Sequence, residues 1–110
     1  MKDMSFENQI VIERKNSLEE LSGNFSKDRD RIEKEFAICK AKIKLLIENA
    51  TYSDLVTGNY RTDYKPKSFS GTLFTFLHRY GVDFEFIDKQ ENTPKYIFCY
   101  FYYYLREILK

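Results

Sequence analysis

The chain has 110 residues, a formal net charge of +1 and 43% hydrophobic residues, among them ten Phe and nine Tyr. This apolar content excludes an intrinsically disordered chain, and the length fits one domain over residues 1–110. No apolar run is typical of a signal peptide or reaches the ~20 residues of a membrane-spanning helix, so we expect a cytoplasmic protein without membrane contact.

Residues 6–50 favour a helical hairpin, with the turn near Gly23. Apolar residues recur at helical spacing over 6–25, and a second apolar stripe with spacings of three and four runs through residues 26–50. An alternative stays open for residues 6–14. Ile10-Val11-Ile12 is β-branched, and Ser17-Leu18-Glu19-Glu20 is a capping box that could begin a new helix, which would leave a strand before it.

Residues 57–71 lose this periodicity and predict a long loop. After it, Ser70 can cap a short helix that ends at Gly81, and the alternating apolar and acidic residues 82–86 predict a strand. Residues 95–110 are aromatic. Thr93-Pro94 is a typical helix start and the length favours a helix, whereas the polar turn at 89–92 leaves a β-hairpin open.

The fold class that we expect is therefore mainly α or α+β. A long N-terminal helical hairpin (6–50) would pack on a small aromatic-rich C-terminal lobe (72–110) that contains a β-strand or hairpin. The stripe over 26–50 could also serve as the seam of a homodimer, although packing within the chain is favoured.

The sequence shows no pattern that indicates catalysis. Cys39 and Cys99 are far apart and form no Cys-x-x-Cys, and the one histidine, His78, lies where it would complement a helix dipole or face solvent. The four glycines are too widely separated for a phosphate-binding loop. We expect no enzyme, no catalytic residue, no cofactor and no metal site.

The C-terminal tyrosines favour a protein partner. A helix over 95–110 could not bury all of them in so small a domain, and exposed tyrosines are typical of protein interfaces. The residues predicted to bind this partner are Tyr100, Tyr102, Tyr103 and Tyr104.

Nucleic acid is the alternative partner. Residues 36–81 hold seven Lys or Arg and three Asp or Glu, a charge of +4, and bases alternate with aromatic rings in the predicted loop. Bases contact phosphates and rings stack on nucleobases. The residues of this alternative are Tyr60, Arg61, Tyr64, Lys65, Lys67 and Arg79.

The leading hypothesis is thus a non-enzymatic binding protein that occupies the surface of a macromolecular partner. Abundant Phe, Ile, Lys, Asn and Tyr with few Ala, Gly and Pro are typical of AT-rich genes. Together with the small size, this suggests a phage or mobile-element inhibitor of a host or defence protein. A small RNA- or DNA-binding regulator is the alternative.

Overall fold

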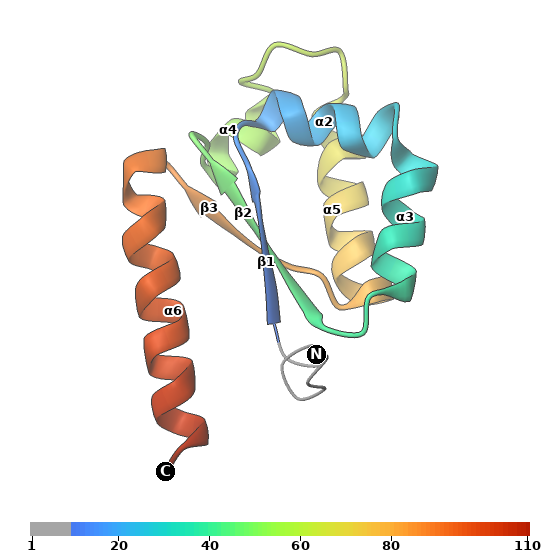
Figure 1. The fold of residues 1–110 in the computed structure, drawn as a ribbon. Helices are drawn as coiled ribbons and strands as arrows, with labels where there is room; N and C mark the ends of the chain where they lie inside the picture. Colours follow the sequence, from blue (N-terminus) through green and yellow to red (C-terminus); the bar gives the residue numbers. More distant parts are fainter. Residues whose placement is uncertain (1–9) are drawn as a thin grey trace.

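The computed structural model describes residues 10–110 and shows an α+β fold, with helices packed on a three-stranded sheet (Figure 1). The part of the predicted N-terminal helix over residues 6–9 lies outside the described residues. The strands are β1 (Ile10–Lys15), β2 (Lys42–Glu48) and β3 (Asp83–Ile87). The helices are α2 (Leu18–Ser26), α3 (Arg29–Ile38), α4 (Tyr52–Thr57), α5 (Pro66–Tyr80) and α6 (Thr93–Ile108), with a short 3-10 turn at Gln90–Asn92.

The three strands are all parallel and follow the order β1-β2-β3. Parallel neighbours need a connection that crosses back over the sheet, usually through helices. Helices α2 and α3 make the first connection, and α4 and α5 make the second. Figure 1 shows α2, α3 and α5 on one face of the sheet and α6 on the other, so the two faces have different coverings.

The predicted helical hairpin over residues 6–50 is wrong. The long helix expected from residue 26 ends at Ile38, because Cys39 has an extended backbone with φ −73° and ψ 123°. Residues 43–48 are all buried, as expected for a central parallel strand that is covered on both faces. Ile43, Leu46 and Ala50 in and after this strand also satisfy helical spacing, which explains the error. The alternative of a homodimer seam on this helix is wrong too, since Ile43 and Leu46 are buried in β2.

The strand alternative for residues 6–14 is confirmed from residue 10 on, because Ile10–Lys15 form a strand and α2 begins after a capping residue. Ser17 Oγ accepts a hydrogen bond from the Glu20 N–H at 3.1 Å, and Glu20 Oε1 accepts one from the Asn16 N–H at 2.7 Å. These bonds satisfy backbone donors that a helix start would otherwise leave unpaired.

The C-terminal elements agree better with the predictions from the sequence. The helix end at Gly81 (φ 70°), the strand after it and the C-terminal helix are confirmed, whereas the predicted helix start at Ser70 is wrong, because Ser70 lies inside α5. The hairpin alternative for residues 95–110 is wrong as well. The predicted loop over 57–71 is shorter, because α5 begins at Pro66, whose missing N–H is tolerated in a first helical turn. No helix within residues 10–110 is long and apolar enough to cross a membrane.

Four phenylalanines hold α2, α3 and α5 together. The ring centroids of Phe25 and Phe76 are 5.1 Å apart, those of Phe36 and Phe76 are 5.6 Å apart, and those of Phe25 and Phe69 are 6.0 Å apart, all edge to face. Each of the four side chains is buried. Edge-to-face pairs add a specific attraction to the burial of apolar area, so this cluster fixes the helical layer.

Candidate functional site

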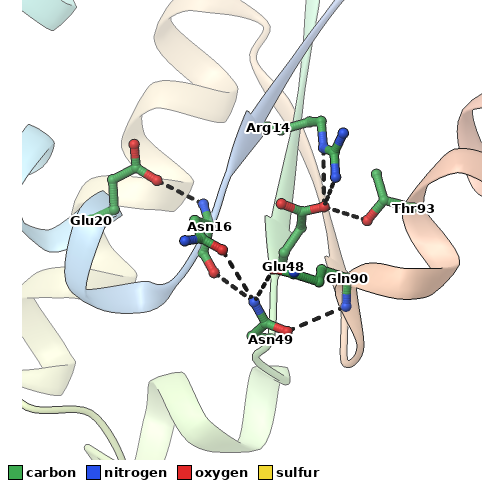
Figure 2. A network of polar contacts seen from close by, with 7 residues as sticks. All are labelled: Arg14, Asn16, Glu20, Glu48, Asn49, Gln90 and Thr93. Atoms are coloured by element: carbon green, nitrogen blue, oxygen red, sulfur yellow. Dashed lines mark hydrogen bonds and ion pairs between the residues drawn. The ribbon is translucent and has the colours of Figure 1, made fainter.

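Asn49 links the carboxyl ends of the three strands (Figure 2). Its backbone N–H donates to Ile87 O at 2.7 Å, and its side-chain Nδ2 donates to Asn16 O at 2.9 Å and to Gln90 Oε1 at 3.0 Å. Ligands of open parallel sheets bind beyond the carboxyl ends of the strands, so this edge is the first place to seek a site. Here the polar groups form hydrogen bonds with one another, so they link the strand ends and offer no open ligand site.

We expect Asn49→Ala to lower the free energy of unfolding by about 1–2 kcal/mol, because it removes the side-chain bonds to Asn16 and Gln90 and leaves a side chain that tolerates the left-handed φ of +58° less well. Asn49→Gly loses the same bonds but adopts this φ freely, so its loss should be smaller by about 0.5–1 kcal/mol. Urea unfolding followed by circular dichroism measures both. Equal losses of stability in the two variants would show that the left-handed φ of residue 49 does not affect the free energy of unfolding.

Glu48 is a buried carboxylate on the α6 face of the sheet. Its side chain is 4% exposed, and Oε2 accepts hydrogen bonds from Arg14 Nε at 3.0 Å, from Arg14 Nη2 at 2.7 Å and from the Thr93 hydroxyl (Figure 2). Burial raises the pKa of Glu48, but the bonds from Thr93 and Arg14 outweigh burial and hold the pKa below its ordinary value. The charged carboxylate therefore joins β1, β2 and the first residue of α6.

Lys44 forms a second link between the sheet and α6. Its side chain is 8% exposed, and its Nζ lies 3.1 Å from Asp83 Oδ2 and 5.7 Å from the ring centroid of Tyr100. Burial lowers the pKa of Lys44, whereas the interactions with Asp83 and Tyr96 raise it and prevail. A charged ammonium over an aromatic ring is attractive, so Lys44 holds the sheet-facing side of α6.

Sequence reasoning missed a pair of charged side chains on the other face of β1. Glu13 and Lys15 are two residues apart on a strand and so share a face, and Lys15 Nζ lies 3.1 Å from Glu13 Oε2. Lys15 is buried, while the Glu13 side chain is 39% exposed. A spacing of two residues places side chains on one face in a strand but not in a helix, and the sequence favours a helix for this segment. No group of three or more His, Cys, Asp or Glu within residues 10–110 is placed to hold a metal ion.

The four tyrosines predicted to bind a partner lie on different sides of α6. Tyr100 and Tyr104 are half-buried, and Tyr100 faces Lys44. Tyr102 and Tyr103 are 47% and 53% exposed. The structure thus leaves two of the four on the surface.

Tyr102 belongs to a row of exposed apolar side chains that sequence reasoning did not identify. The row has spacings of four, three and four residues, and helical geometry places it opposite Thr93 and Tyr100, which face the sheet. We call it the α6 stripe: Phe98, Tyr102, Leu105 and Leu109, with exposed fractions of 66%, 47%, 42% and 80%. The spacing is present in the sequence, but the sequence alone does not show which side of the helix faces away from the sheet.

The aromatic residues of the nucleic-acid alternative have partners within the protein. The Tyr60 and Tyr64 rings lie 5.4 Å and 4.9 Å from the Phe69 ring, and both are half-buried. Tyr60 donates a hydrogen bond to Tyr64 O at 2.5 Å, and the hydroxyls of Tyr64 and Thr72 are 2.8 Å apart. The stack on Phe69 covers one face of the Tyr64 ring, and both hydroxyls have partners within the protein, which leaves less of these side chains to meet a nucleobase.

The bases of that alternative are all exposed but do not form one group. Arg61 and Lys65 lie in the loop before α5, and Lys67 is in its first turn. Arg79 is in the last turn, roughly 20 Å away along a helix that rises 1.5 Å per residue, and contacts Glu33 Oε1 at 3.3 Å. The structure therefore brings three of the four bases into one region.

The residues considered for catalysis are dispersed as well. His78 is exposed in the last turn of α5, and Cys39, just after α3, and Cys99, in α6, are free, half-buried thiols. The expectation that the protein has no catalytic residue and no cofactor stays a prediction.

A scan against protein-family models finds no match, and searches of curated proteins and of solved structures find no similar chain. The case for a function consequently rests on the geometry of this chain.

Proposed function

We propose that this is a non-enzymatic binding protein that acts by placing α6 against the surface of another protein chain. The α6 stripe is the observation that carries the proposal. A helix on a sheet normally turns its apolar face inward and its polar face to solvent. In α6 the side away from the sheet is apolar as well, with Phe98 66% exposed and Leu109, the C-cap, 80% exposed.

The composition of the stripe supports this role. Aromatic side chains are enriched at protein interfaces because they bury a large area and lose few rotatable bonds. The rings of Phe98 and Tyr102 stack with centroids 5.7 Å apart, which orients both toward the same side of α6. The stripe thus offers an ordered apolar ridge.

The attachment of α6 supports the proposal further. Glu48 holds Thr93 at the start of the helix, and Lys44 contacts Tyr100 two turns later. A helix held in place before binding loses less conformational entropy on binding, so more of the contact energy becomes affinity. We expect α6 to bind without rearrangement.

The finer proposal is that the partner is a host or defence protein in the cytoplasm, bound by an inhibitor that a phage or mobile element encodes. Small size and AT-rich composition support it. The alternative, a nucleic-acid-binding regulator, is supported by the exposed bases Arg61, Lys65 and Lys67 near the start of α5. With the tyrosine rings occupied, such binding would rely on phosphate contacts.

A capture experiment with matched variants tests the proposal. Tagged wild-type protein, Tyr102→Ser and Tyr52→Ser are used to capture proteins from host lysate after nuclease treatment. Tyr52 is the control, because it is 49% exposed but lies on α4. We expect wild type and Tyr52→Ser to retain one protein in stoichiometric amount, and Tyr102→Ser to retain about tenfold less, as for loss of an interface hot spot.

Two results would contradict the proposal. Equal retention by Tyr102→Ser would remove α6 from the interface. Loss of every captured protein on nuclease treatment, with recovery of nucleic acid from the untreated sample, would favour the basic region. In that case Lys65→Ala and Lys67→Ala should each weaken binding and reduce its salt dependence.

A further inference from the structure

We infer that the chain bound by the α6 stripe is a second copy of this protein, so that two α6 helices pair antiparallel in a symmetric homodimer. The inference rests on the proposed function and names the occupant of the same surface. Four observations carry it: the symmetry of the stripe, its spacing, the charges beside it and the area that it exposes.

The stripe is complementary to itself when reversed. A two-fold axis between residues 103 and 104 places Phe98 opposite Leu109 of the second copy, and Tyr102 opposite Leu105 of the second copy. Each contact then occurs twice, as an isologous interface requires. Each pair joins a ring to a smaller aliphatic side chain, so large and small residues alternate along the interface and can interdigitate.

The spacing of the stripe is that of a coiled-coil seam. Steps of four, three and four residues are the recurrence of heptad core positions, which keeps a row of side chains facing a partner helix over successive turns. None of the four residues is charged. Ile108, 50% exposed, lies beside the stripe and widens its apolar surface.

Charge favours the antiparallel orientation. Lys95 continues the same row three residues before Phe98 and is exposed. A parallel pair would place the two Lys95 ammonium groups together, whereas an antiparallel pair separates them by the length of the helix. At the ends that then meet, Lys110 is already paired with Glu107, with Nζ and Oε1 3.1 Å apart. Opposed helix dipoles add a small attraction.

The exposed area fits a dimer of modest stability. Side chains of this size have roughly 200 Å² of surface each, so the exposed fractions of the stripe and Ile108 correspond to about 600 Å². A stable interface buries ~800 Å² per partner, and the largest apolar patch of a monomer is typically about 300–600 Å². We therefore expect a dimer that dissociates on dilution.

Sedimentation velocity of the full chain tests the inference. From about 5 µM to about 500 µM, the wild-type mass should rise from 13.3 kDa toward twice that value. Leu105→Glu and Tyr102→Lys should each raise the dissociation constant at least about tenfold, because each buries an unpaired charge twice. Ile38→Glu is the control: Ile38 is 78% exposed on α3, and its replacement should leave the dimer unchanged.

Mixing the two charged variants tests the orientation. In the antiparallel pair, the lysine introduced at 102 faces the glutamate introduced at 105 of the other chain, and Leu105 still faces Tyr102. The mixture should therefore form dimers that neither variant forms alone. A parallel pair would bring none of these partners together, so a mixture as weak as its components would overturn the antiparallel arrangement.

The outcomes also separate this inference from the proposed function. A wild-type chain that stays at 13.3 kDa at the highest concentration overturns the homodimer. If Tyr102 is still needed to capture another protein, the proposed function stands without the homodimer. A dimer that depends on Leu105 with no other captured protein supports the inference and removes the inhibitor role. Far-UV circular dichroism of every variant confirms that the fold is intact.

Discussion

Phe76→Ala should lower the free energy of unfolding by about 4 kcal/mol, the largest loss that we expect from one substitution. Phe76 is fully buried on α5, and its ring contacts those of Phe25 on α2 and Phe36 on α3. The Arg29 guanidinium lies 5.3 Å from its centroid. Alanine would leave a cavity where three helices meet, so the loss includes transfer of the ring to water and the missing contacts around the cavity.

Urea unfolding at low micromolar protein concentration measures this loss without a contribution from dimerisation. Phe76→Leu fills most of the space and should cost about 1–2 kcal/mol. Phe98→Ala is the control on the surface, where the ring is 66% exposed, and should change the stability by less than about 0.5 kcal/mol. A large loss in Phe98→Ala would show that α6 packs more closely than the structure describes.

Local chemistry predicts much of this fold. The capping box at Ser17, the left-handed Gly81 and the helix start at Thr93-Pro94 all lie at the ends of observed helices. Each signal is read from a few neighbouring residues, and the structure satisfies those at Ser17 and Gly81 within the same residues, whereas the Thr93 hydroxyl bonds the distant Glu48.

The N-terminal half could not be predicted in this way, because its strands depend on distant partners. Residues 43–47 lie between β1 and β3, and both faces are buried. Apolar residues on both faces leave the segment without a period of two, and Ile43, Leu46 and Ala50 also satisfy helical spacing. Only the pairing of Val11 with Ile43 and of Leu45 with Phe84 identifies the run as a central strand.

The candidate binding surfaces also differ in how far the sequence predicts them. Exposed tyrosines on α6 follow from helical geometry and from the small size of the core. In contrast, Tyr60 and Tyr64 alternate with bases in the sequence, and their packing on Phe69 depends on how the loop folds over α5. Glu48 accepts hydrogen bonds from Arg14, 34 residues away, and from Thr93, 45 residues away. No local sequence pattern predicts that these three residues meet.

Glu48→Ala should lower the free energy of unfolding by about 3 kcal/mol at pH 7, because it leaves Thr93 without its acceptor and Arg14 without its counter-charge. Arg14 is 49% exposed and regains some hydration, so the loss should be smaller than for a fully buried pair. The start of α6 would also lose its anchor. We therefore expect limited proteolysis to cleave residues 93–108 faster in this variant than in Asn49→Ala, where Glu48 is intact.

Acid should remove the same stabilisation. The folded-state pKa of Glu48 lies below its ordinary value of 4.5, so the carboxylate stabilises the fold above pH 4.5 and loses this effect as pH falls through the folded-state pKa. Asp83 acts in the same direction, since burial raises its pKa but its bond with Lys44 and the bond from the Phe84 N–H lower it further. Urea midpoints measured from about pH 7 to about pH 3 should fall at the acid end.

Glu48→Gln separates the contribution of Glu48 from that of the other acids. Glutamine keeps an acceptor for Thr93 but has no charge for Arg14, so we expect a loss of about 1–2 kcal/mol at neutral pH. Below the folded-state pKa, wild-type Glu48 is neutral as well, and the two proteins should become equally stable. A difference that persists to the lowest pH would mean that shape rather than charge at residue 48 secures α6 to the sheet.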